Sequence, residues 1–401
     1  MLYDLAFSNS LKYLKINMKN NSFIQFVFLI MLSCLFLGSC SKNTPNYNLI
    51  EPVKSINWNA TADSMQVATY NTYLGALGTY VINDSGNDDF QYWPNAHVLD
   101  VLVDAYERTN DVSYLPKMKS LLQGIRAKNG GTFENVFNDD MLWLGNSCVR
   151  AFEATNDLEY KDTAVFLWNE IIKSHSELFG GGITWKKDTP KSKNAVSNGP
   201  AIILAVRLYH LDKDETYLNW AKSLYTWQKA NLVDPETGLV WDNIQEINGQ
   251  VQTNKDWIFT YNVGTWIGAG SRLYKITNEQ KYLDDVIKTA KSAMVNSKLV
   301  TDGILRNEGQ GDGGLFKGIL IRYFTELILL SELNNSDQEA FIEFLKFNAI
   351  TFYKNGLSRP LFRAGPNWSS NPIGSVDLTT QLSGLMLIEA AAKLDEAKLF
   401  N

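Results

Sequence analysis

The 401-residue chain is poor in cysteine, proline and histidine, and it has no excess of basic residues. Three cysteines are too few for a disulfide framework, and ten prolines are too few for a collagen-like or disordered chain. Lys and Arg number 37 against 43 Asp and Glu. Nucleic acid is therefore not an expected partner, because its binding depends on neutralising phosphates with basic side chains. With 45% hydrophobic residues, the sequence predicts a globular protein with a large core.

The usual signatures of metal, serine and thiol chemistry are missing too. The three histidines are far apart, and the chain contains no H-E-x-x-H, G-x-S-x-G or C-x-x-C motif. The run from Gly309 to Gly314 matches a G-x-G-x-x-G pattern, but no βαβ unit surrounds it. That context favours a flexible loop lining a site over nucleotide binding. We therefore expect neither a metal ion nor an organic cofactor.

One segment near the N-terminus does not resemble soluble protein. Phe23 to Leu37 is uncharged and apolar, but shorter than the roughly 20 residues that a membrane-spanning helix needs. Three lysines precede it, as in a secretory signal peptide, and Met18 is a candidate for its true start. The run leads into Leu-Gly-Ser-Cys at positions 37–40, which resembles a bacterial lipobox. The alternative is an ordinary signal peptide with an incidental cysteine at Cys40.

These features divide the chain into three parts. Residues 1–39 are the predicted signal peptide, residues 40–55 a polar tether, and residues 56–401 the folded domain. Lipid attached to Cys40 is then the only predicted contact with a membrane. We expect an exported, membrane-anchored lipoprotein that faces the periplasm or the cell surface and is a monomer.

The folded part contains a repeated pattern: an apolar helix end, a polar turn and a tyrosine that opens the next helix. It occurs four times, 46 to 65 residues apart, in segments that begin at Ala105, Ala151, Leu208 and Leu273. Thr, Asn or Asp in each turn can cap the free N–H groups of the following helix. Each copy therefore predicts a helical hairpin.

Further helices complete the predicted fold. A fifth hairpin fits around Glu332 to Phe347, and helices near Thr61 to Leu77 and Leu378 to Leu394 open and close the chain. Six hairpins closing on themselves form an all-α fold, the (α/α)6 toroid, whose long loops gather at one end. An open solenoid of helix pairs is the alternative that periodicity does not exclude.

Adjacent carboxylates are the remaining candidates for chemistry. Asp284-Asp285 lies in the first turn of a predicted helix, where acidic residues favour the positive end of the dipole, and Asp88-Asp89 lies in a polar loop. Asp139-Asp140 differs because large apolar side chains flank it, and burying two charges there is costly unless they are used or paired. A helix N-cap is the competing interpretation of that pair.

The spacing of neighbouring aspartates suits one kind of sugar chemistry. Consecutive Cα atoms lie about 3.8 Å apart. Two adjacent carboxyl groups therefore readily reach the separation of about 5 to 5.5 Å found in retaining glycosidases, and less readily the roughly 6.5 to 9.5 Å of inverting ones. Close like charges also raise one pKa, which leaves one acid and one carboxylate. Eleven Trp and eighteen Tyr, several beside polar residues in loops, suit a sugar ring, although most Trp in any protein belong to the core.

Several motifs together resemble glycoside hydrolase family 76, the endo-α-1,6-mannanases. They are F-N-D-D-M-L-W-L-G-N-S from Phe137, G-G-I-T-W-K-K-D-T-P from Gly181, G-L-V-W-D from Gly238, T-Y-N-V-G-T-W from Thr260, L-F-K-G-I-L from Leu315, and W-S-S from Trp368 through to Q-L-S-G-L from Gln381. The resemblance covers nearly all of the chain from about Trp58. It implies the same six-hairpin toroid, with residues 56–401 as the catalytic domain.

The resemblance also implies roles for individual residues. Asp139 would be the nucleophile and Asp140 the general acid/base of a retaining double displacement, and Asp242 would contact sugar hydroxyls. The pair is followed by Met141, where the family often has a polar residue. The remaining candidates for lining the sugar subsites are Asn198, Trp143, Trp185, Tyr261, Asn262 and Lys317.

Cleavage of internal α-1,6-mannosidic bonds in α-mannan, as in the fungal mannan backbone, or in manno-oligosaccharides is thus the expected activity. Two alternatives stay open. One is a non-catalytic, glycan-binding helical lipoprotein. The other is an (α/α)6 glycosidase that acts on a different glycan.

Overall fold

The computed structural model describes residues 56–400. The predicted signal peptide, Cys40 and the predicted tether lie outside the described residues. Within residues 56–400, no helix has both the length and the apolar character needed to cross a membrane.

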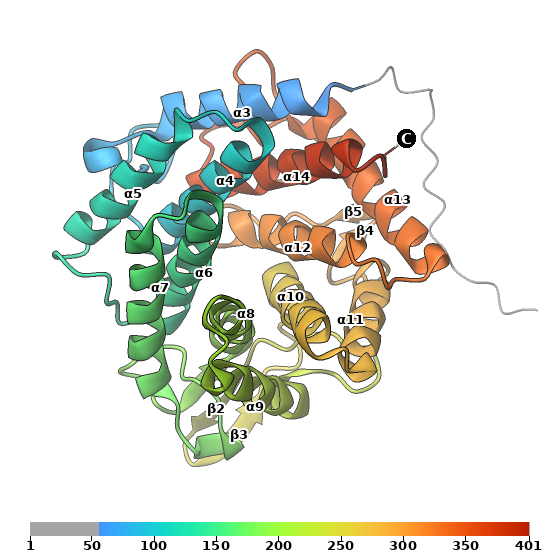
Figure 1. Ribbon diagram of the computed structural model, residues 1–401. Helices are drawn as coiled ribbons and strands as arrows, with labels where there is room; N and C mark the ends of the chain where they lie inside the picture. The colour runs from blue at the N-terminus through green and yellow to red at the C-terminus, as the bar shows by residue number, and fades with distance from the viewer. Residues whose placement is uncertain (1–55, 401) are drawn as a thin grey trace, which may run out of the picture. The chain divides into compact units, whose positions relative to one another are not determined.

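Twelve α-helices alternate between an inner and an outer position along this part of the chain (Figure 1). The inner helices are α4 (Tyr92–Thr109), α6 (Asn138–Thr155), α8 (Ala195–Asp212), α10 (Thr260–Thr277), α12 (Gly313–Ile328) and α14 (Leu378–Glu396). The outer helices are α3 (Trp58–Tyr73), α5 (Tyr114–Lys128), α7 (Leu158–Ile171), α9 (Glu215–Leu232), α11 (Gln280–Ala293) and α13 (Asn335–Thr351).

The inner helices form a closed ring. Each contacts the next in chain order, and the last, α14, contacts both α4 and α3. The first outer helix is therefore the hairpin partner of the last inner helix. The chain is an (α/α)6 toroid, as predicted, and the open-solenoid alternative is wrong because its ends would not meet.

The predicted hairpin turns are confirmed in detail. The residue after each of four inner helices, α4, α6, α8 and α10, adopts the left-handed conformation that ends helices, with φ between 54° and 58°, at Asn110, Asn156, Lys213 and Asn278. The next helix is capped as expected in two of these turns, where Asp157 accepts the Glu159 N–H at 3.0 Å and Asp214 accepts the Thr216 N–H at 2.8 Å.

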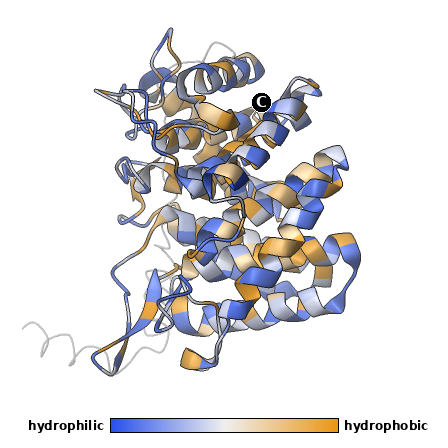
Figure 2. Cartoon of the chain, turned by 90° about the vertical axis from the view of Figure 1, so that its left-hand side faces the viewer, coloured by the Kyte–Doolittle hydropathy of each residue, from blue (hydrophilic) through white to orange (hydrophobic). Residues whose placement is uncertain are grey.

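Small β elements occupy some of the connections between helices. A three-stranded antiparallel sheet consists of β1 (Ser192–Asn194), β2 (Asn243–Ile247) and β3 (Gln250–Thr253), and a two-stranded ribbon of β4 (Val300–Thr301) and β5 (Ile304–Leu305). The β2–β3 turn contains Asn248 and Gly249, both with positive φ, which is the backbone geometry that a two-residue hairpin needs. The long loops and this sheet gather at one end of the helices (Figure 2).

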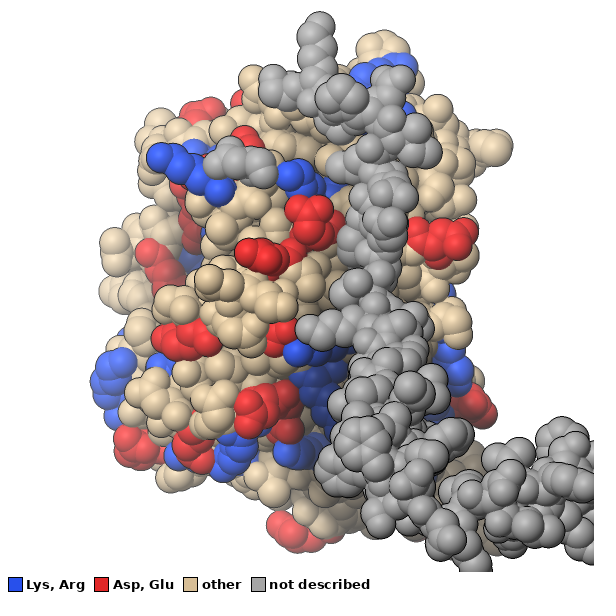
Figure 3. Space-filling model, turned by 90° about the vertical axis from the view of Figure 1, so that its right-hand side faces the viewer, with Lys and Arg blue, Asp and Glu red and all other residues tan. Residues whose placement is uncertain are grey.

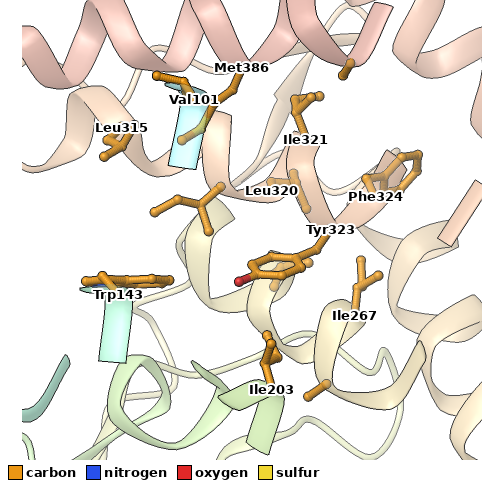
Figure 4. Packing of buried hydrophobic residues seen from close by; sticks show 14 of the residues in the cluster. Val101, Trp143, Ile203, Ile267, Leu315, Leu320, Ile321, Tyr323, Phe324 and Met386 are labelled. Atoms are coloured by element: carbon orange, nitrogen blue, oxygen red, sulfur yellow. The ribbon is translucent and has the colours of Figure 1, made fainter. Parts of the chain in front are cut away.

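The core lies between the inner helices. Side chains from all six converge there, among them Val101 of α4, Trp143 of α6 and Ile203 of α8 (Figure 4). Nearly every residue of α8 and α14 is buried, as expected for helices that have neighbours on all sides.

Glycine sets the distance between two inner helices. A Cβ on Gly264 of α10 would lie 2.6 Å from the Cα of Leu320 on α12, and one on Gly268 would lie 2.3 Å from the Tyr323 ring. Because these glycines are four residues apart, they lie on the same face of α10. They allow α10 and α12 to pack backbone against side chain.

Replacing Gly264 by Ala should therefore destabilise the fold. Overpacking a core position costs about 1 to 3 kcal/mol, since the neighbouring backbone must shift. Ser223→Ala, on the exposed face of α9, is the control and should change the free energy of unfolding by less than about 0.5 kcal/mol. Urea unfolding measures both. Equal stability of the two variants would contradict the proposed close approach.

Candidate active site

The aspartate pair opens α6, and a neighbouring loop holds the start of that helix. Asn138, which is fully buried, donates from Nδ2 to the Thr184 carbonyl at 2.9 Å, and its N–H donates to the Trp185 carbonyl at 3.0 Å. Asp139 and Asp140 follow in the first helical turn, each only partly exposed. The loop thus places the Trp185 side chain beside Asp139.

Both carboxyl groups hold their protons unusually well. Burial raises the pKa of Asp139 to about 7, although the amides at the helix start and the Trp185 side chain favour its charged form. Burial also raises the pKa of Asp140 well above its usual value, and there the charges on Asp139 and Asp312 add to the effect. Of the two, only Asp139 has neighbours that favour its charged form, so it gives up its proton more readily than Asp140.

Asp242 forms a second polar group at the same end of the toroid. Its Oδ1 accepts from Nδ2 of Asn262 at 2.9 Å and from the Tyr261 hydroxyl at 3.2 Å. The charges on Asp242 and Asp139 both raise the pKa of Tyr261, after the larger effect of burial. Tyr261 therefore lies close to both acids. The structure thus brings together Asp139, Asp242 and Tyr261, all of which were singled out in the sequence.

Asp312 is a third acidic group that our sequence analysis did not single out. It immediately precedes α12, and its Oδ1 accepts from the Trp93 indole at 3.2 Å. Its charge raises the pKa of both Asp139 and Asp140, so it faces the pair across the mouth of the toroid. The signal was present in the run Gly309 to Gly314, where Asp312 is the single acid among four glycines.

Aromatic rings border this group of acids. Tyr261 stacks on Phe316 with ring centroids 3.9 Å apart, and Phe259 lies against both of these rings. Trp257, which is 53% exposed, contacts Phe259 at the outer edge. On the other side, Trp185 contacts the Phe137 ring at 5.4 Å. The acids thus lie between apolar ring surfaces, an arrangement that suits a sugar.

Three of the residues predicted to line the sugar subsites, Trp143, Asn198 and Lys317, are buried and contact other parts of the protein. Trp143 is 3% exposed and packs in the core against the His97 ring. Asn198 is fully buried, and its amide bonds the backbone of Ile183 and Asn194 through both hydrogens and the oxygen. The Asn198 amide therefore presents no free group to a sugar, which corrects our sequence-based expectation for that residue, and Trp143 contributes to core packing.

Lys317 is the third of these residues, and its expected subsite role is corrected too. It is 1% exposed, its Nζ donates to the Pro366 carbonyl at 2.6 Å, and it lies 4.2 Å from the centre of the Trp368 ring. Burial lowers its pKa to about 7, partly offset by Glu308. It fastens the loop at residue 366 to α12. Asn262 is also fully buried, but it acts on the site indirectly by holding Asp242.

The other aspartate pairs lie outside this site. Asp285 accepts from the Tyr225 hydroxyl at 3.0 Å and pairs with Lys229 at 2.7 Å, between the outer helices α9 and α11. Asp88 and Asp89 are exposed in a loop. Asp284 and Asp285 lie beyond the first turn of α11, so the helix-start interpretation of that pair is wrong, whereas the surface-loop interpretation of Asp88 and Asp89 agrees with their position.

Comparisons with known proteins agree with this geometry. The sequence matches Glycosyl hydrolase family 76 over residues 57–399. An α-1,6-mannanase from a Salegentibacter species is 56% identical, with a TM-score of 0.83, and the match covers 84% of this chain and all of that one. A variant of the same enzyme, inactive because two consecutive aspartates are replaced by alanine, has been solved with α-1,6-mannotetrose.

More distant relatives are fungal. The mannan endo-1,6-α-mannosidase of Candida albicans is 25% identical over 232 residues, which are 54% of this chain and 48% of that protein. The Saccharomyces cerevisiae enzyme of the same name is 24% identical over 342 residues, or 79% of this chain and 69% of that protein. Across the first four curated relatives that it matches, the chain spans 48% to 64% of their length.

The match over residues 57–399, the closed toroid and the acidic group at its mouth lead to one conclusion: the chain belongs to glycoside hydrolase family 76.

Proposed function

We propose that this glycoside hydrolase cleaves internal α-1,6-mannosidic bonds of α-mannan and its oligosaccharides with retention of configuration. The observation that carries the proposal is the pair of adjacent carboxyl groups at the start of α6, of which only Asp139 has the Trp185 side chain and backbone amides to favour its charged form. Support for the substrate comes from the similar Salegentibacter enzyme, which is an α-1,6-mannanase. The charge distribution also suits a neutral polymer, since acidic and basic side chains are interspersed on the face shown in Figure 3.

In the proposed first step, a carboxylate oxygen of Asp139 attacks the anomeric carbon, and the bond to the oxygen on carbon 6 of the next mannose breaks. Asp140 gives its proton to that leaving oxygen, and a covalent glycosyl ester with Asp139 remains. In the second step, Asp140 takes a proton from water, whose oxygen attacks the same carbon and releases Asp139. Two inversions leave the configuration unchanged, and both side chains return to their starting states.

The neighbouring residues suit this chemistry. One oxygen of Asp242 is held by Asn262 and Tyr261, so the carboxylate is fixed in orientation beside the pair, where sugar hydroxyls would reach it. Trp185 offers an indole next to Asp139. Ring faces at Phe316 and Tyr261 provide apolar surface for the C–H groups of a pyranose.

Export and anchoring complete the proposal. A signal peptide cleaved before Cys40 and lipid on that cysteine would hold the domain at a membrane, where it would meet an extracellular polysaccharide. Mass spectrometry of the protein expressed in a bacterium tests this step, because lipid on Cys40 adds a defined mass that Cys40→Ser removes.

Replacing either member of the pair should abolish activity without unfolding the protein. Asp139→Asn and Asp140→Asn should each reduce the release of reducing ends from α-1,6-mannan by about a thousandfold or more. The unfolding temperature of each variant serves as the control for correct folding. Because both pKa values are raised in the folded protein, the folded state favours the protonated acids. Each aspartate therefore lowers the free energy of unfolding as the pH rises from its pKa in the unfolded chain toward its pKa in the folded protein.

Both variants should therefore unfold at the same temperature as the parent protein near pH 3, and at an equal or higher temperature at pH 8. Full activity in either variant would contradict the assigned roles. Binding of mannan by the parent protein without new reducing ends would favour the glycan-binding alternative. Release from another polymer, but not from α-1,6-mannan, would favour the alternative of a different glycan specificity.

The charge on Asp312 should set the pH range of activity. Because it raises the pKa of both acids, Asp312→Asn should move both limbs of the profile of kcat/KM against pH toward lower pH. Asp302→Asn in the β4–β5 turn removes the same charge from an exposed position and is the matched control, which should leave the profile unchanged. An unshifted profile for Asp312→Asn would show that its carboxylate does not act on the pair.

A further inference from the structure

A second cavity lies at the opposite end of the toroid from the aspartate pair. It has a volume of about 450 Å³ and is lined by the C-terminal parts of all six inner helices. Arg150, on its wall, lies eleven residues beyond Asp139 on α6, which is roughly 16 Å at the rise of an α-helix. This cavity is therefore separate from the proposed catalytic site, and a sugar bound at the pair would not reach it.

Most of the basic groups in this cavity have carboxylate partners. Helix C-termini carry partial negative charge, which accounts for the gathering of cations there. Arg322 pairs with Asp104 at 2.6 Å and with Asp100 at 2.7 Å. Arg150 pairs with the same two acids, and Arg108 pairs with Glu389 at 2.8 Å. These ion pairs neutralise the charges on one side of the cavity.

Arg207, on the α8 side, differs from these arginines. Its side chain is 2% exposed, yet it makes no hydrogen bond to any of residues 56–400. The nearest carboxylate oxygens belong to Glu153 at 3.7 Å and Glu326 at 3.8 Å, beyond hydrogen-bonding distance. Glu326 is already bound by Arg272 at 2.7 Å. A buried guanidinium without hydrogen bonds indicates a partner that the protein chain does not supply.

The neighbours of Arg207 on α10 have unused donors of their own. The Ser271 hydroxyl and Nε of Arg272 are buried without a partner among the described residues, and both residues line the cavity. On this side the cations are Arg207, Arg272 and Lys275, against the two carboxylates of Glu153 and Glu326. Burial and the charge of Arg272 lower the pKa of Arg207 to about 10, which a bound anion would reverse.

We propose that this cavity binds a small oxyanion between α8 and α10, held by Arg207, Arg272 and Ser271. Guanidinium groups donate paired hydrogen bonds to phosphate, sulfate and carboxylate oxygens, and a hydroxyl adds a third donor from another direction. The anion accepts the hydrogen bonds for which these donors have no partner among the described residues, and it links two neighbouring inner helices at their C-terminal ends. Glu153 and Glu326 limit the site to a small ion by repelling further negative charge.

Calorimetric titration of the purified protein with inorganic phosphate, at constant ionic strength, tests this site. The parent protein should bind phosphate saturably, and its unfolding temperature should rise with phosphate as expected for a ligand of the folded state. Arg207→Gln should weaken binding by about tenfold or more, since it removes a charge-assisted contact. Lys173→Gln, at an exposed lysine far from the cavity in the fold, is the control for non-specific salt effects and should bind like the parent.

Parallel titrations with sulfate and acetate distinguish the source of the oxyanion. Binding of phosphate and sulfate assigns a tetrahedral anion, and binding of acetate alone assigns a carboxylate. If Arg207→Gln does not fold, Ser271→Ala removes one donor with little change of volume and should also weaken binding. The proposal is overturned if the parent protein shows no saturable binding, or if Arg207→Gln and Ser271→Ala bind as tightly as the parent.

Discussion

The closure of the inner ring, in which α14 packs against α4 and α3, is the constraint on which the rest of the structure depends. Because an outer helix returns the chain between successive inner helices, the six inner helices of this ring run in the same direction, so their N-termini meet at one end and their C-termini at the other. The six helix dipoles then add, with positive charge at one mouth of the toroid and negative charge at the opposite one. The two ends therefore collect side chains of different charge.

At the N-terminal mouth, the acids that converge are Asp139, Asp140, Asp242 and Asp312, although they come from three separate stretches of chain. The helix N-termini favour their negative charge, whereas burial and mutual repulsion oppose it. This balance differs between the two members of the pair, because the amides of the helix start favour the charged form of Asp139. In the proposed mechanism, this difference lets two chemically identical neighbours serve as proton donor and nucleophile.

At the C-terminal mouth, arginines replace the acids, and most are neutralised by carboxylates on adjacent inner helices. The exception at Arg207 is a site where helix packing leaves a buried cation without a hydrogen bond to any of residues 56–400. Both ends thus combine buried charge with an opening toward solvent. The rigid packing between them, set by glycine contacts such as Gly264 against Leu320, keeps the two ends structurally separate.

The sequence by itself determined the helical hairpins, because apolar spacing and turn residues act over a few positions. It also singled out Asp139 and Asp140, since two adjacent charges among aromatic residues are rare without a use. The family resemblance pointed correctly to the fold. Only the tertiary structure decided that the ring closes, that Trp143, Asn198 and Lys317 serve packing and loop attachment, and that Asp312 faces the pair. The physical reason is that burial and charge depend on residues 46 to more than 150 positions away, whose distances in space no local pattern contains.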